Sequence, residues 1–149
     1  MGSVKSQNRR KKEYLMQYQH LVAQQKRLEG RIKQIRLECI FPESTRFDGM
    51  PAVRNTAHDL SDAMIRHEEK KNEVLSQLIE IMTEKLEVIS DIEMKVEAIE
   101  DPIERNILEL RYLEGMPDLI QVADALGYSH GRVKHKHGDA LRHFKLDTP

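Results

Sequence analysis

The chain has 149 residues, of which 39% are hydrophobic, 5% aromatic and 33% charged, with no tryptophan and a formal net charge of −1. Few aromatic residues and many charges are typical of long amphipathic helices that touch along narrow stripes, which argues against an all-β fold or a doubly wound sheet. The single cysteine, Cys39, excludes an internal disulfide and a zinc-thiolate cluster.

No apolar run approaches the ~20 residues that a membrane-spanning helix needs. The basic stretch from Lys5 to Lys12 is not followed by the uninterrupted apolar core of a signal peptide. We therefore expect a soluble, cytoplasmic protein without a membrane partner.

The charges are unevenly distributed. Residues 1–46 carry 11 basic and 4 acidic side chains, whereas residues 47–100 carry 6 and 13. The stretch 130–145 holds five Lys or Arg residues against one acid, Asp139, inside the segment 101–149, which as a whole carries 7 basic and 8 acidic side chains. A locally basic helix of this kind indicates contact with a polyanion, and a solvated helix face is the alternative.

The first predicted helix follows a polar arm that ends near Asn8 and stops at Phe41-Pro42, because proline disfavours helical geometry in the residue before it. Its apolar residues recur at spacings of three and four, which predicts a narrow seam. The seam comprises Leu15, Tyr18, Val22, Leu28, Ile32, Ile35 and Cys39. Residues 41–57 lack a helical period, so we expect a connector there.

The second predicted helix begins near His58 and continues for some forty residues. Its seam comprises Leu60, Met64, Leu75, Leu78, Met82, Leu86, Ile89, Ile92, Val96 and Ile99. Two such helices most simply pair as an antiparallel, coiled-coil-like hairpin over residues 1–100, and an Asp at Leu86 should then disrupt the seam. Because a two-helix hairpin is thin, we expect a homodimer, with a monomer capped by the C-terminal helices as the alternative.

A second domain is predicted over residues 101–149. Asp101 is a candidate N-cap, Pro102 opens a helix, and Gly115 follows its end. A short helix is expected at Leu119–Leu126, and a final helix, capped by Ser129, should run from His130 to about Phe144.

The last two predicted helices have the spacing of a helix-turn-helix. That motif needs a small residue where the helices cross, a residue that tolerates positive φ in the turn, and a branched apolar anchor on the second helix. Ala123, Gly127 and Val133 meet these needs, and an ordinary three-helix cluster is the alternative. The motif core comprises Val122, Ala123, Leu126, Gly127 and Val133.

The segments Ile107–Gly115 (ILELRYLEG) and Val122–Ser129 (VADALGYS) resemble region 4 of sigma-70-type factors, which binds promoter −35 elements. With the hairpin expected from the two seams, this resemblance completes the prediction of an all-α fold, in which a long antiparallel helical hairpin precedes a C-terminal sigma-70 region 4-like helix-turn-helix. The layout also resembles small phage and prophage transcriptional regulators of the ArpU-like type. Lys136 departs from the pattern, since such sequences often carry an apolar residue there.

The resemblance places the start of the final helix in the major groove. Arg132 is the candidate for reading guanine, because its forked guanidinium can meet O6 and N7 together. Lys134 and Lys136 are expected to contact phosphates, and so are Arg142 and Lys145 further along the helix. The candidate DNA-binding residues are Ser129, His130, Gly131, Arg132, Lys134, His135, Lys136, Arg142 and Lys145.

The histidines at 130, 135, 137 and 143 do not have the spacing of a metal site, and we expect His137 to be a packed side chain. No phosphate-binding loop or nucleophile motif is present in the sequence, so we expect neither a cofactor nor an enzyme.

The sequence therefore predicts a sequence-specific DNA-binding transcriptional regulator of phage or prophage type. Its expected partner is double-stranded DNA, and RNA polymerase is a candidate protein partner. The alternatives are a small terminase-like packaging factor and a protein-interaction module that contacts RNA polymerase without reading bases.

Overall fold

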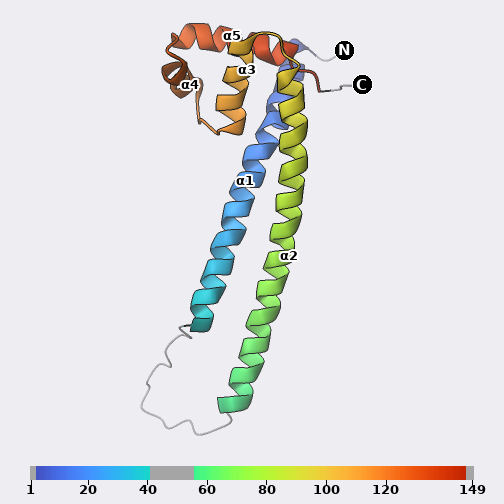
Figure 1. Ribbon diagram of the computed structural model, residues 1–149, viewed down its shortest axis with the longest axis vertical. Coiled ribbons are helices and arrows are strands. Elements are labelled where there is room, and N and C mark those ends of the chain that lie inside the picture. The colour runs from blue at the N-terminus through green and yellow to red at the C-terminus, as the bar shows by residue number, and fades with distance from the viewer. Residues whose placement is uncertain (1–2, 41–55, 147–149) are drawn as a thin grey trace. The chain divides into compact units, whose positions relative to one another are not determined.

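A computed structural model describes residues 3–40 and 56–146, so most of the expected connector at 41–57 lies outside the described residues. All regular structure in the described part is helical, in agreement with the predicted all-α fold (Figure 1). The elements are α1 (Val4–Ile40), α2 (Thr56–Glu97), α3 (Pro102–Leu108), η1 (Glu109–Leu113), α4 (Leu119–Leu126) and α5 (His130–His143).

Helix α1 begins earlier than the sequence predicted, because Val4 to Asn8 are helical rather than a polar arm. Ser3 starts the helix: its Oγ lies 3.3 Å from the Lys5 nitrogen, and its carbonyl accepts from the Ser6 nitrogen at 2.7 Å. A serine N-cap satisfies backbone nitrogens that would otherwise lack a partner and so stabilises this extra turn.

The chain divides into two compact units. One contains Met1–Val22 and Glu84–Pro149, and the other contains Ala23–Thr83. This division differs from the expected boundary at residue 100, because the first turns of α1 and the last turns of α2 pack with the C-terminal helices in one unit.

In the unit Ala23–Thr83, α1 and α2 pair as the antiparallel hairpin that the sequence predicted. Ile32 and Ile35 of α1 are buried against Val74 of α2. Leu28, Leu75 and Leu78 pack around them. Every one of these six residues except Val74 belongs to a predicted seam, so the seams are correct in this part of the hairpin.

The other unit has a core to which α1, α2 and the C-terminal helices all contribute. Its buried residues are Leu15, Ile92, Val96, Ile99, Leu108, Tyr112, Ala140, Leu141 and Phe144. Leu15 and Phe144 are completely buried although they lie near opposite ends of the chain. The beginning of α1 is therefore part of the scaffold on which α5 rests.

The predicted seam of α2 is wrong at Leu60, Met64, Met82 and Leu86, which are exposed. Leu86 is 65% exposed, whereas Val74 and Ile92 are buried. Helix α2 carries two overlapping apolar stripes, and the stripe through Val74, Val88 and Ile92 is the one that packs in the cores. The spacing of apolar residues alone could not distinguish the two stripes. Because Leu86 is exposed, Leu86→Asp is not expected to disrupt the packing of α1 against α2.

Among the helices of the described residues, none combines the length and the apolar character needed to cross a membrane.

Candidate nucleic-acid interface

The helix that precedes the motif begins as the sequence predicted. The Asp101 Oδ1 accepts a hydrogen bond from the Ile103 nitrogen at 2.8 Å, and Pro102 occupies the first helical position. The helix then widens into the π-helix η1, in which the Glu114 nitrogen donates to the Glu109 carbonyl at 2.8 Å. Gly115 ends it with a φ of 80°, a left-handed conformation that glycine adopts without strain.

Helix α4, the turn and helix α5 have the local geometry of a helix-turn-helix. The Asp118 side chain caps α4 by accepting from the Gln121 nitrogen at 2.9 Å. Gly127 has a φ of 72°, and the Tyr128 nitrogen donates to the Ala123 carbonyl at 3.0 Å, which closes the end of α4. Ser129 caps α5 by accepting from the Arg132 nitrogen at 3.2 Å.

The predicted motif core lies between these helices. Val122 and Val133 are completely buried, Ala123 is 2% exposed, and Ile107 of α3 joins them. Leu126 is half-buried and packs against the same cluster. The small crossing residue, the left-handed turn and the branched anchor thus occupy the places that the motif requires.

All but one of the predicted DNA-contacting residues are exposed to solvent. Gly131 and Gly138 on α5 have open space where a Cβ would stand, so the backbone there is approachable. The exposed candidates are Ser129, His130, Gly131, Arg132, Lys134, His135, Arg142 and Lys145, and the exception is the half-buried Lys136.

The Arg132 side chain packs over the ring of Tyr128. Its guanidinium carbon lies 4.4 Å from the centre of the Tyr128 ring, at a distance typical of a cation–π contact. Tyr128 itself packs against the motif core. The contact between Arg132 and the Tyr128 ring was not predicted from the sequence. The signal that could have indicated it is the tyrosine four positions before the arginine.

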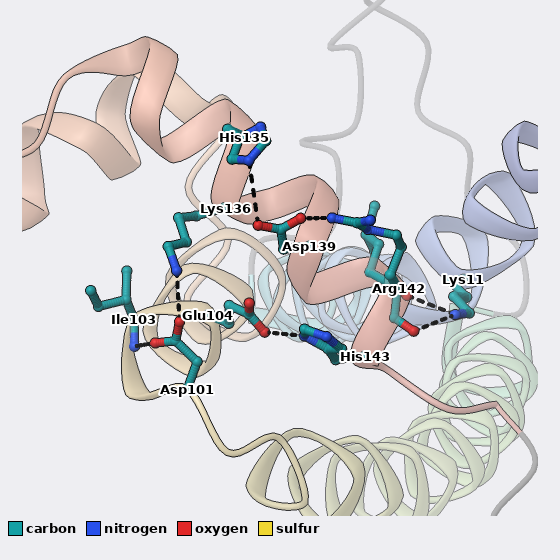
Figure 2. A network of polar contacts seen from close by, with 10 residues as sticks. Lys11, Asp101, Ile103, Glu104, His135, Lys136, Asp139, Arg142 and His143 are labelled. Carbon is teal, nitrogen blue, oxygen red and sulfur yellow. Dashed lines mark hydrogen bonds and ion pairs between the residues drawn. The ribbon is translucent and has the colours of Figure 1, made fainter.

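Lys136 has a structural contact that the sequence did not predict. Its Nζ lies 2.8 Å from the Asp101 Oδ2, so it joins α5 to the start of α3 (Figure 2). The hydrogen bonds from Lys136 and from the Ile103 nitrogen hold the pKa of Asp101 below its usual range. This ion pair directs the ammonium group toward the protein rather than toward a phosphate.

Asp139 lies among the cations of α5. Its carboxylate forms an ion pair with Arg142 and lies 3.7 Å from the His135 Nε2 (Figure 2). A carboxylate at this place lowers the positive potential of the exposed face. Nearby, the buried Glu104 contacts the His143 Nδ1 at 2.7 Å and ties α3 to the end of α5.

His137 is a packed side chain, as predicted. It is 7% exposed, and its Nε2 lies 2.9 Å from the Tyr112 hydroxyl. Burial, together with the charges of Lys12 and Arg111, lowers the pKa of His137 to about 4. Within the described residues, no group of three or more His, Cys, Asp or Glu side chains is arranged to hold a metal ion.

The start of α1 is a part of this site that sequence reasoning missed. The Lys11 Nζ donates to the Leu141 carbonyl at 2.7 Å and to the Arg142 carbonyl at 3.4 Å (Figure 2). Asn8 also lines a surface groove of about 520 Å³ together with Lys134 and Arg142 of α5. The excess of basic residues in the first turns was a signal, but nothing in the sequence paired those turns with α5.

Residues 101–145 match the family model of sigma-70, region 4. This segment contains α3, η1, α4 and α5, so the C-terminal helices form a sigma-70 region 4 domain, as the sequence resemblance implied. No curated protein and no solved structure matches the chain.

Proposed function

We propose that this chain is a non-enzymatic, sequence-specific DNA-binding regulator of transcription. The observation that carries the proposal is the exposed opening of α5, with Gly131 unobstructed and Arg132 accessible to solvent, in a domain of the sigma-70 region 4 type. The motif core packs α5 beneath that surface, and a helix presented in this way fits the major groove.

Arg132 is the residue proposed to read a base. Its guanidinium can donate two hydrogen bonds to guanine O6 and N7, and each such bidentate contact is worth ~1 to 3 kcal/mol of discrimination. The Tyr128 ring limits the freedom of the arginine before binding, which reduces the entropy lost in the complex. Lys134, Arg142 and Lys145 are proposed to contact phosphates.

A narrower role is proposed from the whole layout. A long helical N-terminal region joined to a sigma-like C-terminal domain resembles ArpU-like regulators, so we propose a phage or prophage regulator whose site lies near a promoter. Since region 4 domains act in transcription, RNA polymerase is the proposed protein partner.

A homodimer is proposed from α2. Ile79, Met82 and Leu86 recur at spacings of three and four and are 64%, 42% and 65% exposed. An apolar stripe on a long helix is typical of a coiled-coil contact, and a second α2 has the matching stripe. A dimer would also present two recognition helices to a site with two halves.

The function is tested by mixing the full-length protein with a random pool of duplex DNA and sequencing the recovered molecules over several rounds. The proposal expects enrichment of one motif and competition by that motif over a scrambled duplex. Recovery without enrichment would contradict sequence-specific binding, and absence of any recovery at low salt would contradict DNA binding itself.

A further inference from the structure

The first turns of α1 form a dense cluster of positive charge. Residues 4–12 contain five basic side chains and no acid, and we name this stretch the N-terminal basic segment. Its basic residues are Lys5, Arg9, Arg10, Lys11 and Lys12, all exposed except the half-buried Lys11. Arg9 pairs with Glu13 at 3.0 Å, so part of its charge is compensated.

Lys11 attaches this segment to α5. Its ammonium group contacts the carbonyls of Leu141 and Arg142 in the last turn of α5, where the helix dipole favours a cation. Burial lowers the pKa of Lys11, in keeping with its position between the two helices. The neighbouring side chains of the segment are thereby held beside the end of the recognition helix.

Two surface grooves are lined jointly by the start of α1 and by α5 or the residues that follow it. Asn8 borders the groove that contains Lys134 and Arg142, on the exposed face of α5. A second groove of about 520 Å³ is lined by Gln7, Arg10 and Lys11 of α1, and by Lys145 beyond α5. Among the described residues that line this second groove there is no carboxylate, so Arg10 and Lys145 make it strongly cationic.

Lys12 directly follows Lys11 on α1, and its charge contributes to the lowered pKa of His137 on α5. Arg10 and Lys12 are thus two exposed cations of the segment, and the Glu13 carboxylate in the same turn of α1 forms its ion pair with Arg9 at 3.0 Å.

We propose that the N-terminal basic segment is a second DNA-contacting element, which binds the phosphate backbone of the duplex whose bases α5 reads. The proposal rests on the proposed function, because it extends the DNA-binding surface of α5 along the same duplex. Duplex DNA is favoured as the occupant because the segment continues that surface with exposed cations, which suit closely spaced phosphates. The region 4 match begins at residue 101, so this contact belongs to the part of the chain outside it.

The test uses the full-length protein with the double variant Arg10→Gln/Lys12→Gln. Each phosphate neutralised contributes ~0.9 to the slope of log Kobs against log salt, so the variant should lose about 1.8 from that slope on any duplex. The matched control is Lys26→Gln/Lys33→Gln, which removes the same charge from exposed positions further along α1. The control should keep the parent slope, and so should Arg10→Lys/Lys12→Arg, which retains both charges.

An unchanged slope in Arg10→Gln/Lys12→Gln, with the parent still binding DNA, would overturn the second contact and leave the proposed function standing. An equal loss in the control would also overturn it, because the effect would then follow net charge rather than position. If the parent protein binds no duplex at all, the proposed function and this inference both fail. Thermal unfolding of each variant, followed by circular dichroism, verifies that the exposed substitutions leave the fold intact.

Discussion

The Tyr112 hydroxyl and the His137 Nε2 lie 2.9 Å apart in the interior, where η1 meets α5. Burial raises the pKa of Tyr112 to about 12 and lowers the pKa of His137 to about 4. Tyr112 therefore stays protonated and donates to a neutral imidazole at physiological pH. The pair connects η1, which precedes the motif, to α5.

Because of the lowered pKa of His137, the free energy of unfolding should depend on pH in the acidic range. The pKa of His137 is about 4 in the folded protein, whereas a solvated histidine in the unfolded chain has its ordinary pKa of 6.5, so the unfolded state takes up the proton first as the pH falls. The free energy of unfolding should therefore decrease between pH 6.5 and pH 4, by about 3 kcal/mol in total. Urea unfolding at a series of pH values measures the loss.

The variant His137→Gln isolates this effect, because glutamine cannot titrate in that range. Its unfolding free energy should vary less between pH 6.5 and pH 4 than that of the parent, whereas the exposed His130→Gln should follow the parent. Parallel curves for the parent and His137→Gln would assign the acid sensitivity to other groups.

Leu15 should stabilise the packing of α5 although it lies near the other end of the chain. It is completely buried in the cluster that contains Leu141 and Phe144. Leu15→Ala should cost about 2 to 5 kcal/mol through lost burial and a cavity. The half-exposed Leu37→Ala, by contrast, should change stability by less than ~1 kcal/mol. Equal melting temperatures for the two variants would show that α1 is not part of that core.

Leu86 provides a test of the homodimer. Because it is 65% exposed, Leu86→Asp should leave the fold of one chain intact while it places a charge in the proposed α2 contact. Light scattering should then report a dimer for the parent and a monomer for the variant, with helical content unchanged by circular dichroism. A monomeric parent would remove the dimer from the proposal.

Asp139 should limit binding to random DNA. Asp139→Asn releases Arg142 from its ion pair and removes the negative charge near His135. The variant should bind a random duplex more tightly and with a salt slope steeper by about one. Asp124→Asn, an exposed acid on α4, serves as the control for net charge. If both variants gain the same affinity, the position of Asp139 has no special effect.

The local features of the fold could be predicted from the sequence. Asp101 and Ser129 cap the helices they were expected to cap, and Gly127 adopts the left-handed turn. Each depends on a few neighbouring residues, because capping and turn geometry are decided within four or five positions.

The long-range features could not be predicted in the same way. Leu86 and Val88 both continue apolar stripes of α2, and only the packing partner decides that Val88 packs in the core. Likewise, the contact of Lys136 with Asp101 and that of Lys11 with the end of α5 join residues 35 and 130 positions apart. Side-chain spacing along one helix carries no information about such partners.

Competition binding of Arg132→Ala tests most directly whether the start of α5 reads bases. The affinities of the full-length variant for the selected site and for a scrambled duplex are compared with those of the parent and of Arg142→Ala. We expect Arg132→Ala to lose ~1 to 3 kcal/mol on the selected site and much less on the scrambled duplex, whereas Arg142→Ala weakens both about equally. Equal losses on both duplexes for Arg132→Ala would contradict base reading by this residue.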